Sequence, residues 1–201
     1  MKKFFIKICK FFGFEIIDQN EFTSPTLNKE LNEDLSILNK KSIVLPLGEV
    51  KITRKVKSIL IIIRVNTEIE VWDQNKRRLF EKPKIEYSIR SIKSLINSIN
   101  LCQNKYSGLK IKIVILDDSS RDENLDKIKE IIKDVNGEII PLDTKKFGTK
   151  IKKQKTQETF SNLASLLQSF EIGKNMGEDL IFFVEDDYLH FETMLEEMIA
   201  T

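Results

Sequence analysis

From Ser58 onward the sequence alternates short, strongly apolar segments with longer segments of helical periodicity, and this alternation limits the folds open to the chain. Four strands are predicted from apolar runs at residues 58–65, 111–116, 138–142 and 179–184. Helices are predicted over residues 84–100, 123–135, 156–170 and 191–199, with Gly173 and Gly177 marking the end of the third. Strands that alternate with helices indicate an α/β fold, in which a mostly parallel, Rossmann-like sheet carries helices on both faces.

Acidic side chains follow two of these strands. They are Asp117 and Asp118 after the strand at 111–116, and Glu185, Asp186 and Asp187 after the apolar run 181–184. Four apolar residues in a row predict that this last strand is buried in the core. Crossover connections place the carboxyl ends of parallel strands along one edge, where α/β sheets bind ligands. We therefore expect the two acidic groups to share an edge of the sheet.

Carboxylates gathered at one edge repel one another unless water solvates them or a cation bridges them. Mg²⁺ and Mn²⁺ favour such oxygen ligands, especially when substrate phosphates complete the coordination shell. Glu185, Asp186 and Asp187 are therefore candidate ligands of a metal–diphosphate site; alternatively, Asp186 or Asp187 caps the following helix. Asp117 or Asp118 could accept a hydrogen bond from a base or a ribose, or could form a strand-end turn.

The sequence lacks the motifs of other classes of phosphate-binding protein. The sequence contains no G-x-G-x-x-G and no G-x-x-x-x-G-K-[ST], which disfavours dinucleotide binding and P-loop hydrolysis. A receiver domain would place carboxylates after its first strand as well, but that strand is followed by Asn66 and Thr67. A nucleotidyltransferase would need a glycine-rich basic loop at the same place, and the segment after Thr67 has no glycine.

Length, charge and cysteine content limit the number of domains, the class of partner and the cellular compartment. The 201 residues suit one domain with an extension, which we divide into residues 1–50 and 51–201. Lys and Arg number 33 against 31 Asp and Glu, a net charge of +2 that argues against a nucleic-acid partner. Cys9 and Cys102 show no metal-binding spacing, and no apolar run is long enough to cross a bilayer. We expect a reduced, cytoplasmic protein.

The first 50 residues have a different character. Residues 1–17 predict a helix with a basic stripe, made of Lys3, Lys7 and Lys10, beside bulky aromatic side chains. Such a helix could lie on the inner face of an anionic membrane, or could dock on the domain's own surface. Residues 18–41 predict a linker with one short helix, and residues 42–50 and 51–57 predict the two strands of a hairpin, with Pro46 or Gly48 at an edge or bend.

Three segments together resemble the family 2-type glycosyltransferases of the GT-A fold. The first is IIIRVNTE, which ends at Glu68, where the family has an apolar strand followed by Pro-Val-Tyr-Asn-Glu. The second, LDDSSRD, is similar to the family's Val-Asp-Asp-Gly-Ser-x-Asp, with Ser119 in place of the glycine. The third, Glu185-Asp186-Asp187, resembles the D-x-D element, and Ser94 stands where the family often has a serine. The resemblance covers residues 58–201.

The resemblance implies a role for each matched residue. Asp117, Asp118 and Glu68 would contact the nucleoside of a nucleotide-sugar donor. Asp187, with Glu185 and Asp186, would hold Mn²⁺ or Mg²⁺ against the donor diphosphate. Candidate phosphate partners are Arg90, Lys145 and Lys146, although such side chains are more often solvated surface charges. His190 could serve as a base or a ligand, although a lone histidine in a loop is more often structural.

Arg64, Asn66 and Thr67 depart from the family's pattern, which weakens the expectation of backbone contacts to the nucleotide there. The family's catalytic base lies well beyond the D-x-D element, so we expect the base beyond Thr201 and only the donor-binding half in this chain. The hypothesis is a metal-dependent glycosyltransferase, or its donor-binding portion, acting on a glycan or lipid-linked acceptor. The alternative is a nucleotide-sugar-binding module without a catalytic base of its own.

Overall fold

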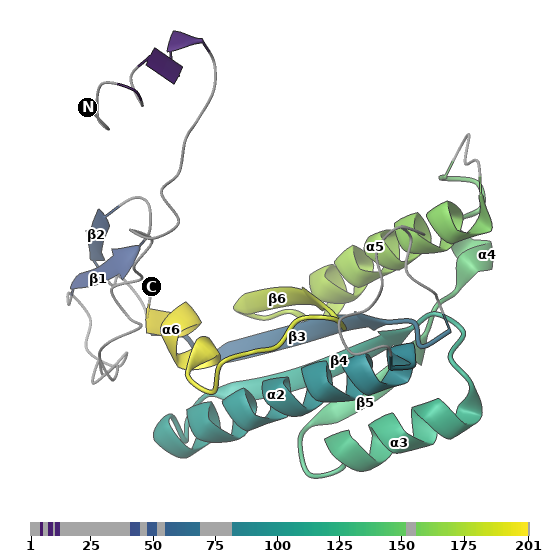
Figure 1. The fold of residues 1–201 in the computed structure, drawn as a ribbon. Coiled ribbons are helices and arrows are strands. Elements are labelled where there is room, and N and C mark those ends of the chain that lie inside the picture. Colours follow the sequence, from purple (N-terminus) through teal and green to yellow (C-terminus); the bar gives the residue numbers. More distant parts are fainter. Residues whose placement is uncertain are drawn as a thin grey trace.

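The computed structural model of the protein describes Phe5, Ile8, Cys9, Phe11, Phe12 and residues 41–44, 48–51, 55–68, 82–151 and 156–200. Its main feature is a four-stranded, all-parallel sheet with the strand order β5-β4-β3-β6 (Figure 1). The strands are β3 (Ser58–Val65), β4 (Lys110–Asp117), β5 (Gly137–Pro141) and β6 (Leu180–Glu185). The helices of this part are α2 (Lys84–Lys105), α3 (Asp122–Ile132), α4 (Thr144–Phe147), α5 (Gln157–Met176) and α6 (Met194–Ala200). The predicted α/β fold with a parallel sheet is therefore confirmed.

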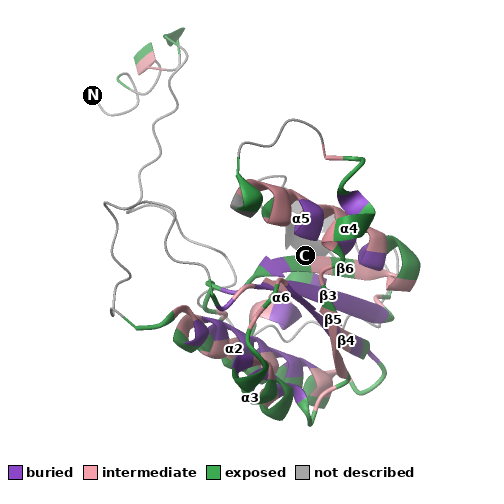
Figure 2. Cartoon of the chain, turned by 90° about the vertical axis from the view of Figure 1, so that its right-hand side faces the viewer, coloured by how far each residue is buried: buried purple, intermediate pink, exposed green. Residues whose placement is uncertain are grey.

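Helices cover both faces of the sheet. One face packs against α2, α3 and α6, and the other packs against α5 (Figure 1). Because side chains alternate along a strand, Ile61 and Ile63 of β3 point into the first layer while Leu60 and Ile62 point into the second. Both sets are almost fully buried, so the central strand is covered on its two faces (Figure 2).

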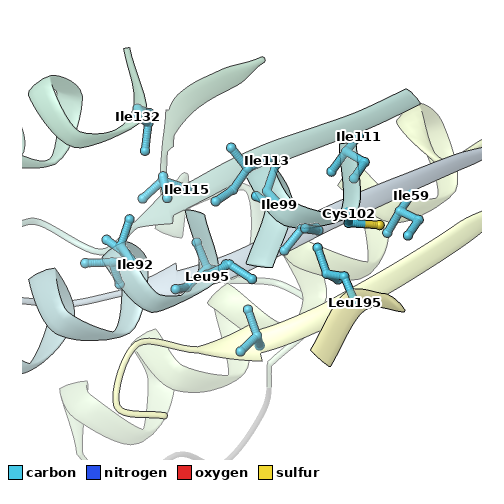
Figure 3. Close-up of a cluster of buried hydrophobic side chains, with 14 of the residues drawn as sticks. Ile59, Ile92, Leu95, Ile99, Cys102, Ile111, Ile113, Ile115, Ile132 and Leu195 are labelled. Atoms are coloured by element: carbon cyan, nitrogen blue, oxygen red, sulfur yellow. The ribbon is translucent and has the colours of Figure 1, made fainter. Parts of the chain in front are cut away.

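The larger core lies between the sheet and α2. Helix α2 presents a face of residues spaced three and four apart, which is the spacing of one helical side. Its apolar members Ile92, Leu95, Ile99 and Cys102 pack against isoleucines of β3 and β4 (Figure 3). Three serines are also buried on this face, namely Ser88, Ser91 and Ser98.

The prediction that residues 181–184 form a buried core strand is wrong. Of these residues only Val184 is buried, whereas Ile181 and Phe183 are 40% and 42% exposed. The reason is position, since β6 is the last strand of the sheet order and pairs with β3 alone among the described strands. Its side facing α5 is consequently only half covered.

Helix α5 extends further than the sequence indicates. It passes through Gly173 and ends at Met176, with Gly177 as its C-cap. A Cβ atom at Gly173 would lie 3.1 Å from the Phe183 ring and 3.3 Å from Ile181. Gly173 therefore marks a close approach of α5 to β6 and not the helix end.

Smaller boundary differences occur elsewhere. Helix α2 continues past residue 100 to Lys105, and α6 starts at Met194, after the predicted start at residue 191. The lysine-rich connection after β5 contains the unpredicted helix α4, whose Phe147 is fully buried. The side chain of Asp143 caps α4 by accepting a hydrogen bond from the Lys146 backbone N–H at 3.2 Å.

The predicted hairpin has different strands. Strand β1 (Lys41–Val44) pairs antiparallel with β2 (Gly48–Lys51), in a register that joins Lys41 to Lys51. Both strands thus come from residues 41–51, and the prediction that 42–50 pairs with 51–57 is wrong. Of the two residues predicted at an edge or bend, Gly48 begins β2 and Pro46 lies outside the described residues.

The remaining N-terminal predictions fall mostly outside the described residues. Phe5, Ile8, Cys9 and Phe11 have helical backbone, while the basic stripe of residues 1–17 and the linker helix lie outside the described residues. The membrane-surface role and the division at residue 50 stay predictions. Across the described ranges, no helix has both the length and the apolar character of a membrane span.

Candidate functional site

The carboxyl ends of β4, β3 and β6 lie side by side, and both predicted acidic groups stand at this edge (Figure 1). In the register of the sheet, Val65 of β3 lies opposite Asp117 of β4, and Arg64 of β3 lies opposite Glu185 of β6. The end of β3 therefore separates the two acidic groups by two strand spacings, or about 10 Å. The parallel register confirms that they share one edge.

Asp117 and Asp118 form a turn in which each carboxylate has a different environment. Asp117 is only 5% exposed and accepts hydrogen bonds from the Ser120 backbone N–H at 3.2 and 3.3 Å. Burial raises the pKa of Asp117, although the hydrogen bonds from Ser120 oppose the rise. Asp118 is half-buried, and its Oδ2 accepts a hydrogen bond from Asn66 Nδ2 at 3.2 Å. Asp117 thus supports the turn, while Asp118 lies nearer the solvent.

Ser119 is the residue at which this turn departs from ordinary backbone geometry. Its φ angle is 63°, in the left-handed region that favours glycine. The turn therefore places a serine in a backbone conformation that glycine adopts at lower cost.

Glu68 is held by three neighbours at the end of β3. Its Oε1 accepts hydrogen bonds from Thr67 Oγ1 at 2.9 Å and from Asn124 Nδ2 at 3.1 Å. Its Oε2 forms an ion pair with Arg121 Nε at 2.8 Å. The Thr67 hydrogen bond, followed by the Arg121 charge, lowers the pKa of Glu68 despite partial desolvation. The carboxylate is consequently ionised at neutral pH and fixed in place.

The sequence reasoning missed Asn124 and Arg121. Asn124 is buried one helical turn before Ile128, on the side of α3 that packs against the sheet. The sequence does contain a signal for Asn124, because it is a polar residue at a helix position where the periodicity predicts an apolar one. Arg121 precedes the helix as its N-cap and gave no comparable signal.

The three consecutive carboxylates at the end of β6, Glu185, Asp186 and Asp187, have different surroundings. Glu185 faces α5 and pairs with Arg64, whose guanidinium also donates to Asn162 Oδ1 at 2.9 Å and to Ser165 Oγ at 3.1 Å. Asp187 is exposed, and no hydrogen bond or ion pair joins its carboxylate to another residue in the described ranges. Its carboxylate is therefore open to solvent or to a ligand.

Asp186 turns to the opposite side and is 6% exposed. It accepts a hydrogen bond from Ser88 and pairs with Lys84 Nζ at 2.7 Å, so both of its oxygens are engaged. Lys84 and Ser88 lie in the first turns of α2. Asp186 thus fastens the start of α2 to the end of β6, which differs from the helix-capping role considered for it.

Serines of α2 hold the chain that follows this turn. Ser94 Oγ accepts a hydrogen bond from the His190 backbone N–H at 3.0 Å, and Ser98 Oγ accepts one from Leu195 N–H at 3.1 Å. With the Ser88–Asp186 bond, these form a row of three hydroxyls along one side of α2, which we call the serine row. The serine row fixes the position of the segment between Asp186 and Leu195.

His190 is half-buried in that segment. Its ring meets Phe182 edge-on at 6.2 Å between centroids, and no described residue hydrogen-bonds its Nε2 atom. Burial lowers the pKa of His190, so the imidazole is neutral at physiological pH. Packing against Phe182 agrees with a structural role for this histidine.

Two of the predicted phosphate-binding cations lie on α4 and the third lies on α2. Lys146 pairs with Glu171 of α5, and Lys145 is exposed on α4. Arg90 is exposed on the second turn of α2. The Lys146 ammonium is therefore engaged by Glu171 on α5.

The described residues contain no cluster of three or more histidine, cysteine, aspartate or glutamate side chains arranged to hold a metal ion. The metal prediction therefore depends on ligands that a substrate would add. Comparisons of this chain with known protein families, with curated protein sequences and with solved structures found no match.

Proposed function

We propose that the chain is a metal-dependent glycosyltransferase, or the donor-binding portion of one, with a GT-A-like sheet of the family 2 type. It would bind a nucleotide-sugar at the carboxyl edge of the sheet and transfer the sugar to a glycan or lipid-linked acceptor. The observation that carries this proposal is the placement of two acidic groups on either side of the β3 end, about 10 Å apart. One group is suited to a nucleoside and the other to a metal-bound diphosphate.

The fit to a metal comes mainly from Asp187, which is exposed and carries no ion pair among the described residues. Glu185 is half-exposed but already pairs with Arg64, so we give it a supporting role through a water molecule. One carboxylate, with diphosphate oxygens and water, suits the octahedral shell of Mg²⁺ or Mn²⁺. Asp186 is bound to Lys84 and Ser88, so we give it a positioning role. When bound, the metal supplies Lewis-acid stabilisation of the departing nucleoside diphosphate.

On the other side of β3, Asp118 is the best placed acceptor for a ribose hydroxyl or a base N–H. Asp117 is occupied by the turn, and Glu68 is occupied by Thr67, Asn124 and Arg121. Within the described residues only Asn66 donates to the Asp118 side chain, which leaves acceptor capacity on that carboxylate. Glu68 and Asp117 then order the two loops that frame the nucleoside.

Calorimetric titration with UDP in the presence and absence of Mn²⁺ tests this assignment. We expect Mn²⁺ to strengthen UDP binding, and Asp187→Ala to remove that gain. Asp118→Ala should weaken UDP binding with or without the metal, since it acts on the nucleoside. Glu178→Ala is the matched control, because Glu178 is an exposed carboxylate at the opposite edge of the sheet, before β6.

Unchanged metal-dependent affinity in Asp187→Ala would overturn the metal assignment. Release of UDP from UDP-sugars by the chain, with Mn²⁺ present, would distinguish a transferase from a module that binds the donor without turnover. We also propose that residues 1–17 hold the protein at the inner face of the cytoplasmic membrane, where a lipid-linked acceptor would be available.

A further inference from the structure

A cavity of about 540 Å³ lies on the α5 side of the sheet, next to the end of β6. Its walls are mainly aromatic and aliphatic, and include Phe170 and Phe183, whose rings meet edge-on at 5.2 Å between centroids. Tyr188 and Leu189 form an exposed rim. Small-molecule sites have volumes of roughly 300–1,000 Å³ and mostly apolar walls with a few polar groups. The size and the lining therefore suit a small organic ligand.

The polar end of the cavity carries no net charge. Arg64 and Glu185 line it as an ion pair, and Asn162 and Ser165 satisfy the other side of the Arg64 guanidinium. His190 also lines the cavity and is neutral at physiological pH, because burial lowers its pKa. An ionic head group would leave one charge uncompensated there, whereas an uncharged hydroxyl could donate a hydrogen bond to the Glu185 carboxylate.

We propose that this cavity binds a molecule with an apolar body and an uncharged, hydroxyl-bearing head group, with the head group at Glu185 and the body between Phe170, Phe183 and Leu189. Resting on the proposed function, this molecule is the acceptor. Glu185 ends β6 and lies two residues before Asp187, so a hydroxyl bound at Glu185 stands at the same sheet edge as the proposed diphosphate site. The acceptor is then a hydroxylated amphiphile and not a purely polar glycan.

Alkyl glucosides provide the probe, because their head group is fixed while the chain length varies. We measure their binding to the full chain by calorimetry, below the concentration at which they form micelles and without nucleotide or metal. Affinity should increase by about fourfold for each methylene from hexyl to octyl glucoside, as expected for burial of the alkyl chain. Methyl glucoside should bind too weakly to detect. Octyl sulfate and octyltrimethylammonium should bind at least tenfold more weakly than octyl glucoside.

Three variants separate the cavity from general surface hydrophobicity. Phe170→Ala should weaken octyl glucoside binding by about tenfold or more, the loss expected when one aromatic wall is removed. Leu189→Asp should abolish it by placing a charge on the apolar rim. Phe191→Ala should leave it unchanged, because Phe191 is 74% exposed, like Leu189 at 73%, but does not line the cavity.

Equal binding of all three head groups, independence from chain length, or equal effects of Leu189→Asp and Phe191→Ala would each overturn the proposal. Absence of octyl glucoside binding to a folded chain would overturn it as well. These results are independent of donor binding, which the UDP and Mn²⁺ titration measures. Loss of the alkyl glucoside signal with intact UDP binding rejects only the cavity, and the reverse outcome rejects only the donor site.

Discussion

Asp186→Ala is the substitution for which the structure gives the largest expected effect. Asp186 is buried and holds both Lys84, whose side chain is 15% exposed, and Ser88. Removing one partner of a buried ion pair costs about 3–5 kcal/mol, because the remaining charge stays in a poor solvent. We expect a value near 3 kcal/mol, since the flexible Lys84 stem can move its ammonium toward water.

The neighbouring carboxylates provide matched controls. Glu185→Ala should cost about 1 kcal/mol, because its ion pair with Arg64 is half-exposed and Asn162 and Ser165 keep their bonds to the guanidinium. Asp187→Ala should change the free energy of unfolding by less than about 0.5 kcal/mol, since Asp187 is a surface residue. Three consecutive acidic residues should thus give three different stabilities.

Urea unfolding followed by circular dichroism measures these differences as shifts of the midpoint at constant slope. For Asp186→Ala the melting temperature should fall by about 6–12 °C, at 2–4 °C for each kcal/mol in a chain of this size. The double variant Lys84→Met/Asp186→Leu should recover most of the loss, because no unpaired buried charge remains. An Asp186→Ala midpoint equal to that of Asp187→Ala would refute this account of the turn.

Two further predictions concern the left-handed turn and the single histidine. Ser119→Gly should raise the free energy of unfolding by about 0.5–1 kcal/mol in urea denaturation, since relief of the left-handed serine exceeds the added chain entropy of glycine. Ser120→Gly should lower the free energy of unfolding, because it removes the hydroxyl that accepts a hydrogen bond from Thr67 N–H at 3.2 Å. A change of the same sign in both variants would contradict the turn geometry. Because burial lowers the pKa of His190 in the folded state, its contribution is fully present above the unfolded pKa of about 6.5 and is lost as the pH falls from there toward the folded pKa. The chain has one histidine, so its NMR titration can be assigned to His190 and should show a midpoint below 6.5. The His190→Gln variant should lose less stability than the wild type over that pH range. A midpoint at or above 6.5 would show that the imidazole is not desolvated.

The burial of the central strand β3 was predictable from the sequence, whereas the exposure of the edge strand β6 was not. β3 has the predicted bounds because a strand covered on both faces needs apolar side chains on both, and the sequence shows five in a row at 59–63. The run 181–184 has the same appearance, yet β6 lies at the end of the sheet order and stays half-exposed. Local composition reports that a segment is apolar, but it does not report how many neighbours cover it. Gly173 shows the same limit, since close packing against β6 and helix termination both favour glycine.

The site was predictable as far as topology determines it. Parallel strands bring Asp117 and Glu185 to one edge, and that followed from the alternation of strands and helices. The opposite directions of Glu185 and Asp186 follow from the alternation of side chains along a strand. That Lys84 and Ser88 would meet Asp186 depends on packing between segments about one hundred residues apart, which no local pattern encodes.

The serine row has a consequence for the cost of ligand binding. A loop that becomes ordered only when a ligand arrives loses conformational entropy at that moment, and the measured affinity falls accordingly. Here Ser94 and Ser98 hold the segment behind the acidic turn in the free protein, and Ser88 holds the turn itself. Asp187 consequently projects from a scaffold whose ordering is already complete, so replacing Ser94 by alanine should weaken the affinity for a ligand at Asp187 without removing any group that touches it.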